Sequence, residues 1–228
     1  MITSLIKSAV IVLASASLFA LPVTAAAAET GVSESAEDTS VADPHARHRA
    51  MLKKPRADAE SSADVTLRDN LLITRNGDAV LFATDVVRER IVVIDFVYTT
   101  CTTICPVLSA IFQQVQEALG ERLGADVGLI SISVDPVRDT PQRLKAYAEQ
   151  LRAQPEWVWL TGEKASVDDV LVGLGAYTPD FADHPSIVLV GDPQSGTWKR
   201  YFGFPGPNKI LAAVDELAAA RHVSHARP

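Results

Sequence analysis

The sequence has few cysteines, since only Cys101 and Cys105 occur among its 228 residues. Iron–sulfur clusters and four-thiolate zinc sites each need four cysteines, so both kinds of centre are excluded. The Cys-x-x-Cys spacing of thioredoxin-type redox motifs is also missing, because three residues separate the two thiols. Both thiols instead fall in one short stretch, YTTCTTICPVL, at residues 98–108.

An excess of positive charge is also missing. Lys and Arg number 21 against 28 Asp and Glu, which gives a formal net charge of −7. This balance argues against a nucleic-acid partner. The apolar fraction of 47% is ordinary for a globular protein, and the length allows one domain with appendages or at most two small domains.

The N-terminal residues 1–28 have the pattern of a secretory signal peptide. Lys7 precedes an apolar run, and the alanines after Thr24 offer cleavage sites. An uncleaved membrane anchor is the alternative, because residues 8–28 are long enough to span a bilayer. We expect an exported protein in either case, periplasmic or anchored to the inner membrane and facing the periplasm, with no other membrane contact.

Residues 29–64 have the composition of a flexible tether, acidic and rich in Ser and Thr at first and then basic. Residues 65–220 have the pattern of a folded domain, and residues 221–228 are expected to form a tail. Hydrophobic periodicity and turn residues predict a hairpin around Asn76-Gly77, followed by alternating strands and helices. The expected strands are 91–97, 127–134, 157–160, 186–191 and 197–203. Helices are expected at 106–119 and 208–221, and two more are expected after the Thr140 N-cap and after a cap at residues 166–169.

This order predicts an α/β fold with a mixed sheet and helices on both faces. It is the order of a thioredoxin-like fold with an N-terminal β-hairpin extension. A domain of this size can bury a sufficient core without a disulfide, so a purely structural role for the two thiols is disfavoured.

Cys101 and Cys105 lie between a buried strand and a helix, which is where open α/β sheets bind ligands. A helix N-terminus lowers thiol pKa values, and soft thiolates select Cu(I), zinc or iron–sulfur clusters. Two thiolates one helical turn apart can clamp one ion or close a disulfide. For copper, which needs few ligands, an imidazole is the natural third donor.

Five histidines are present, and only His184 falls in the predicted folded domain. A lone histidine is usually structural, but the strand after His184 is expected beside the strand that leads to the thiols. Weaker candidates are His45, His48 and Met51 in the tether, and His222 and His225 in the tail. Asp135 is expected to be a turn residue, and the alternative is a group near the site or an oxygen ligand for Cu(II). Asp183 precedes His184 and either tunes it or is solvated.

The segments FVYTTCTTICP, ISVDPVRDTPQRLKAYA, WLTG and DHPSIVLVGD resemble the Sco/SenC family of copper-binding thioredoxin-like proteins, over residues 65–220. The resemblance implies one copper ion, Cu(I) or Cu(II), held by Cys101, Cys105 and His184. It also implies delivery of copper to the Cu(A) centre of cytochrome c oxidase, with an oxidase subunit as the copper-receiving partner. Thr102 and Pro185 depart from the family pattern beside the proposed ligands.

Two enzymatic alternatives stay open beside a metallochaperone. In a thiol–disulfide oxidoreductase, Cys101 and Cys105 would be the redox-active pair acting on cysteines of a partner protein. A thiol peroxidase would need one activated cysteine with a nearby Arg, and would give His184 no role. We expect a metallochaperone without catalytic residues.

Overall fold

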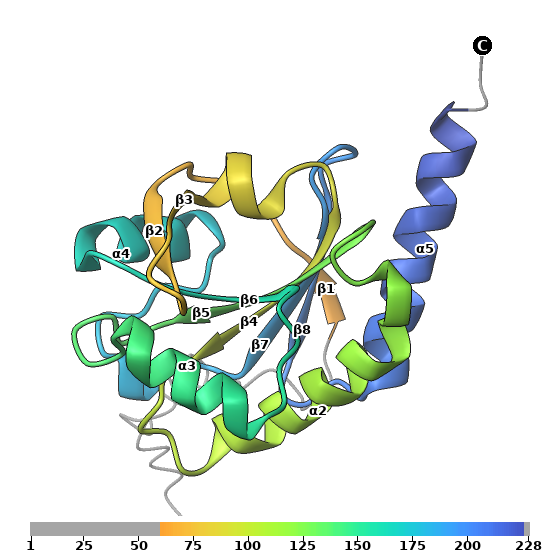
Figure 1. Ribbon diagram of the computed structural model, residues 1–228. Coiled ribbons are helices and arrows are strands. Elements are labelled where there is room, and N and C mark those ends of the chain that lie inside the picture. The colour runs from red at the N-terminus through yellow and green to blue at the C-terminus, as the bar shows by residue number, and fades with distance from the viewer. Residues whose placement is uncertain (1–59, 226–228) are drawn as a thin grey trace, which may run out of the picture. The chain divides into compact units, whose positions relative to one another are not determined.

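The sheet is built around β4 (Ile91–Val97), whose seven residues are all buried. The computed structural model describes residues 60–225, in which eight strands form one sheet in the order β1-β8-β7-β4-β5-β6-β2-β3 (Figure 1). The other strands are β1 (Glu60–Ser62), β2 (Leu71–Thr74), β3 (Ala79–Leu81), β5 (Val127–Ser133), β6 (Trp157–Thr161), β7 (Ile187–Asp192) and β8 (Thr197–Phe202).

Strand direction decides which loops meet. β4, β5 and β6 are parallel, and Val97 at the end of β4 is level with Ser133 at the end of β5. β7 runs antiparallel to β4. The loops that follow β4 and β5 therefore share one edge of the sheet with the loop that precedes β7.

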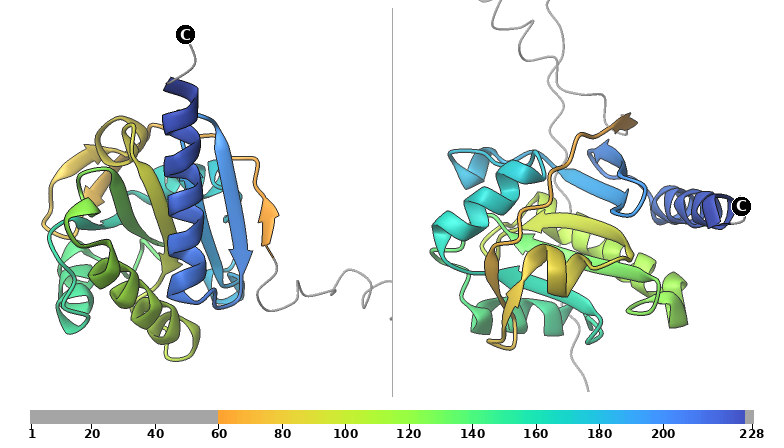
Figure 2. Two further views of the ribbon diagram at one scale, coloured as in Figure 1. Left: turned by 90° about the vertical axis from the view of Figure 1, so that its right-hand side faces the viewer. Right: turned by 90° about the horizontal axis from the view of Figure 1, so that it is seen from above.

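Helices cover both faces of the sheet (Figures 1 and 2). On one face, β4 contributes Val93 and Val97 to a core with α2 (Ile104–Leu119), α3 (Pro141–Gln150) and α5 (Pro207–His225). The alternate β4 side chains pack on the other face, against α4 (Lys164–Gly173) and the short helix η1 (Phe82–Val87). The strand is therefore apolar along its length because both of its faces are covered. Two single turns, η2 (Gly120–Arg122) and η3 (Phe181–Asp183), complete the helical segments.

The expected mixed α/β fold with an N-terminal hairpin is confirmed. β2 and β3 are antiparallel, and the turn between them contains Gly77 at a φ of 92°, a conformation that glycine adopts without strain. The hairpin joins the sheet at its edge, where Ile73 of β2 is level with Thr161 of β6.

Several predicted boundaries differ from those in the structure. The tether was expected to reach residue 64, but Glu60–Ser62 form β1 on β8, and the Ala63 N–H donates to the Trp198 carbonyl at 3.0 Å. The predicted tail begins too early, because α5 continues to His225. α4 begins at Lys164, so the cap expected at residues 166–169 lies inside the helix.

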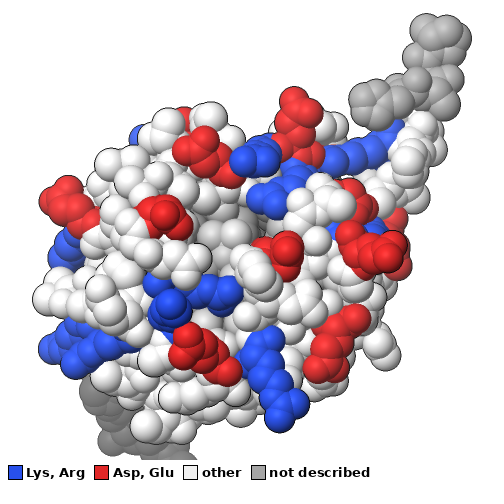
Figure 3. All heavy atoms as spheres, in the orientation of Figure 1, with Lys and Arg blue, Asp and Glu red and all other residues white. Residues whose placement is uncertain are grey.

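The signal-peptide prediction and the candidates His45, His48 and Met51 lie outside the described residues. Within residues 60–225, no helix has both the length and the apolar character needed to cross a membrane. Acidic and basic side chains are interspersed on the face shown in Figure 3.

Thr140 caps α3 as predicted, because its side chain accepts a hydrogen bond from the Arg143 N–H and Pro141 occupies the first turn. Replacing Thr140 with Ala should lower the free energy of unfolding by about 1 kcal/mol, measured by urea denaturation. Thr103→Ala is the matched control, because Thr103 precedes α2 without a capping side-chain hydrogen bond. Equal losses in the two variants would show that the Thr140 cap contributes nothing of its own.

Candidate metal centre

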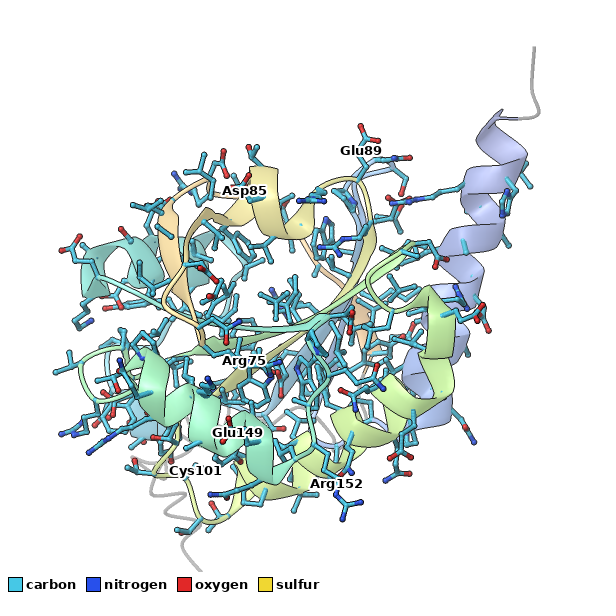
Figure 4. All side chains as sticks on the ribbon, in the orientation of Figure 1. Arg75, Asp85, Glu89, Cys101, Glu149 and Arg152 are labelled. Atoms are coloured by element: carbon cyan, nitrogen blue, oxygen red, sulfur yellow. The ribbon has the colours of Figure 1, made fainter. Side chains whose placement is uncertain are left out.

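The two thiols lie at the start of α2, at the edge of the sheet where β4 ends. A turn closed by the Cys101 N–H on the Tyr98 carbonyl at 3.1 Å leads from β4 into the helix. The helix was expected from residue 106 but begins at Ile104, so Cys105 belongs to its first turn and Cys101 precedes it. Both thiols are free and buried, with 7% of Cys101 and 1% of Cys105 exposed. In Figure 4, Cys101 lies on the loop that enters α2, on the side of the sheet away from Glu89.

The sulfur of Cys101 takes the place of a helix-capping group. The Cys105 N–H donates to Cys101 Sγ at 3.3 Å, whereas Thr103 at the N-cap position makes no side-chain cap. The first N–H groups of a helix have no partner within the helix and carry the positive end of its dipole. They therefore favour a negative charge on the Cys101 sulfur.

The two thiols differ in acidity. Burial opposes ionisation of Cys101, but hydrogen bonds from the Cys105 side chain, from the Cys105 and Thr103 N–H groups and from Tyr98 lower its pKa to about 7. Burial and the hydrogen bond to Cys101 raise the pKa of Cys105. At neutral pH the pair therefore holds one thiol close to ionisation and one that keeps its proton.

His184 follows η3 and precedes β7, which pairs with β4 as expected. His184 is 8% exposed, and its Nε2 lies 3.1 Å from the Phe96 carbonyl oxygen. Because that oxygen can only accept, Nε2 carries the donated proton. Burial lowers the pKa of His184, against the opposing effect of the Phe96 and Pro185 backbone groups. The imidazole is therefore held neutral, which is the form that binds metals.

The structure brings the two thiols together but does not gather a complete ligand set. Within the described part of the chain, no three side chains of His, Cys, Asp or Glu lie close enough together to hold one metal ion. The soft thiols and the neutral imidazole suit copper by their chemistry. Nε2 of His184, however, donates its proton to the Phe96 carbonyl, so this nitrogen offers no lone pair to a metal.

The structure places three further candidates, Asp135, Asp183 and His222, on different elements. Asp135 is 4% exposed, and its Oδ2 accepts a hydrogen bond from Arg138 at 3.0 Å. Asp183 lies in η3, and His222 lies on the surface of α5. The Arg138 guanidinium also lies 5.1 Å from the centre of the Phe181 ring, and that ring meets Tyr98 edge to face at 5.2 Å.

Asp139 is a residue whose role the sequence does not reveal. It lies in the loop between β5 and α3, where its carboxylate is fully buried and accepts from the Thr99 N–H, the Thr99 hydroxyl and the Ser133 hydroxyl. Thr99 lies 40 positions away. No local signal indicates a contact across that separation.

Asp95 is a second residue whose role the sequence does not reveal. It is an acidic residue within the otherwise apolar run of β4. It is fully buried, and its Oδ1 accepts from Ser131 Oγ at 2.5 Å, while its Oδ2 has no hydrogen-bond partner among residues 60–225. Burial raises the pKa of Asp95 to about 7, partly opposed by the Ser131 hydrogen bond. An ionised carboxylate is therefore unfavourable at this position.

Comparison with known proteins gives a family match. The model described as SCO1/SenC matches residues 59–219. A SCO2-like protein of Rickettsia conorii is 32% identical over 150 residues, which cover 61% of this chain and 71% of that protein. The chain spans 46% and 66% of the length of two further Rickettsia relatives.

Solved structures agree in fold. Bradyrhizobium japonicum ScoI with copper bound is 28% identical, with a TM-score of 0.54, and the match covers 68% of this chain and 99% of that one. BsSco, a member of the Sco family of cytochrome c oxidase assembly proteins with an identified disulfide switch, is 23% identical, with a TM-score of 0.58. That match covers 69% of this chain and 96% of BsSco. These similarities confirm the thioredoxin-like fold.

The lowered pKa of Cys101 predicts that its alkylation by iodoacetamide rises with a midpoint near pH 7, because the thiolate is the reactive form. Cys105→Ala should move the midpoint upward, since it removes a hydrogen-bond donor to Cys101. Peptide mass spectrometry locates the modified residue. Faster alkylation of Cys105 than of Cys101 at pH 7 would contradict the assigned order.

The raised pKa of Asp95 predicts a stability that falls as pH rises. Between about pH 4 and pH 7, the unfolded chain has lost this proton while the folded chain still holds it, so each step up in pH favours unfolding. Asp95→Asn lacks this proton, so its stability advantage over the wild type should grow by a few kcal/mol between pH 5 and pH 8, at about 1.4 kcal/mol per pKa unit. Urea denaturation at both pH values measures this. A stability difference that does not change with pH would contradict the assignment.

Proposed function

The chain belongs to the SCO1/SenC family, and on that premise we propose that it is a copper metallochaperone that holds one copper ion through Cys101, Cys105 and His184. The observation that carries the proposal is the pair of buried thiols at the start of α2, joined by the 3.3 Å contact from the Cys105 N–H to Cys101 Sγ. His184 lies just before β7, the strand next to β4, which leads to those thiols.

The acidity of the ligands favours stepwise loading. Cys101, which is close to ionisation at neutral pH, is the first donor. Burial opposes a negative charge on Cys105, so this thiol loses its proton only when the positive charge of a bound metal offsets that cost. Copper binding therefore releases a proton. His184 is already neutral and joins last. Because Nε2 carries the proton donated to the Phe96 carbonyl, the lone pair that binds the metal is on Nδ1. A ligand that arrives last is also the first that a receiving protein can replace.

Relatives support the choice of metal and partner. Bradyrhizobium japonicum ScoI has been solved with copper bound, and BsSco is described as an oxidase assembly protein. We therefore assign to this chain the delivery of copper to an oxidase subunit of the Cu(A) type or a related copper target, after export to the periplasmic side. Ile104, Val107 and Val137 are exposed apolar side chains on the elements that follow β4 and β5, where a partner would approach the thiols.

A second candidate function is thiol–disulfide exchange, favoured by the unequal acidity of the two thiols. The Cys101 thiolate would attack a disulfide of a partner protein, form a mixed disulfide and release one partner thiolate. Cys105, after losing its proton, would attack the Cys101 sulfur, close the Cys101–Cys105 disulfide and release the second partner thiol. The partner is reduced by two electrons and this chain is oxidised by two. This reaction needs neither copper nor His184.

Anaerobic titration with Cu(I) in the presence of a competing chelator separates the two functions. The wild type should bind one Cu(I) per chain, and His184→Ala should weaken binding on the order of a hundredfold, because one of three ligands is lost. His222→Ala, on the surface of α5, is the control and should behave as the wild type. Unchanged stoichiometry and affinity in His184→Ala would refute the proposed ligand set.

A further inference from the structure

The turn that presents Cys101 is anchored at one point. The Thr99 N–H lies 3.1 and 3.2 Å from the two carboxylate oxygens of Asp139, and the Thr99 hydroxyl donates to Oδ1 at 2.5 Å. Thr99 is the second residue of the turn that the Cys101 N–H closes on Tyr98. One carboxylate thus holds the backbone and the side chain of the residue two positions before the first thiol.

The Asp139 carboxylate, which anchors this turn, is itself held by β5 and not by β4, the strand that leads into the turn. Oδ2 of Asp139 accepts from the Ser133 hydroxyl of β5 at 2.7 Å, and the Asp139 N–H donates to the Asp135 carbonyl at 2.9 Å. Asp139 is fully buried, so water does not compete for these hydrogen bonds. The loop after β5 therefore holds the loop after β4 in place, across the edge where the thiols lie.

From these contacts we infer that Asp139 is a positioning residue for Cys101, which acts through Thr99 and sets both the copper affinity and the redox equilibrium of the Cys101–Cys105 pair. The copper part of this inference rests on the proposed function, whereas the redox part needs only the two thiols.

The physical reason is preorganisation. Thr102, directly after Cys101, is exposed, and it lacks the ring by which a proline would stiffen the backbone. Rigidity of the turn must then come from the residues before the thiol, where hydrogen bonds to a buried carboxylate are strong. A turn held in the geometry of the dithiol form loses less freedom when a metal binds.

The redox effect has a definite sign. Oxidation removes two protons and two electrons from the Cys101 and Cys105 thiols and forms the S–S bond, with oxidised dithiothreitol as the acceptor, which becomes the reduced dithiol. The thiols are free in this structure, so the contacts between Thr99 and Asp139 are those of the dithiol form. An interaction that stabilises the dithiol raises the midpoint potential of the pair, so its loss should lower that potential.

Three substitutions test the inference in the full folded domain. Thr99→Val removes the hydroxyl donor, and Thr99→Ser keeps it. Ser133→Ala removes the other hydroxyl on the same carboxylate, but it keeps both Thr99 hydrogen bonds and the bond from the Asp139 N–H to the Asp135 carbonyl that holds the loop. Copper affinity is measured by competition with a Cu(I) chelator, and the dithiol–disulfide equilibrium is measured in dithiothreitol redox buffers without metal.

We expect Thr99→Val to weaken Cu(I) binding about tenfold and to shift the thiol–disulfide equilibrium toward the disulfide by at least about threefold. Thr99→Ser should restore both values, and Ser133→Ala should stay within about twofold of the wild type, even if its thermal stability falls. Wild-type behaviour of Thr99→Val, or equal effects in Ser133→Ala, would overturn the inference. A wild type that binds no copper would refute the proposed function, while the redox measurement would still decide the role of Asp139.

Discussion

The pairing of β4 with β5 on one side and β7 on the other is the constraint on which the rest of the site depends. Because β4 and β5 are parallel and in register to their last residues, the loops that follow them leave the sheet at the same level. Because β7 is antiparallel to β4, the loop before it arrives at that level too. Thiols, carboxylate anchor and imidazole come from three distant parts of the sequence and reach one edge of the sheet.

At this edge of the sheet, hydrogen bonds and burial fix the positions and the protonation states of the proposed ligands. The Cys101 sulfur receives an N–H at the start of α2, where the helix favours negative charge, whereas Cys105 is held as a thiol by its burial. His184 is neutral and makes its Nε2 contact with a backbone carbonyl. Each thiol therefore differs from its proposed metal-bound state by no more than one proton, and the imidazole is already in the neutral form that binds metals. Such a site can load and release its cargo without large changes in the fold.

The sequence predicts those features that follow from local pattern. The buried run of β4, the Asn76-Gly77 hairpin and the Thr140 cap are each confirmed, because each depends on residues close together in the chain. β1 was missed because its three residues are all exposed, and its pairing with β8 gives no periodic signal. The roles of Asp95 and Asp139 also depend on distant partners, Ser131 and Thr99, and no spacing in the sequence indicates those contacts.

The central claim is that two sulfurs and one imidazole nitrogen bind one copper ion. X-ray absorption of the Cu(I)-loaded protein counts these neighbours directly. The account predicts two sulfur neighbours near 2.2–2.3 Å, on the order of metal–thiolate bond lengths, and one nitrogen neighbour that disappears in His184→Ala. A first shell with only sulfur, or a nitrogen neighbour that persists in His184→Ala, would contradict it.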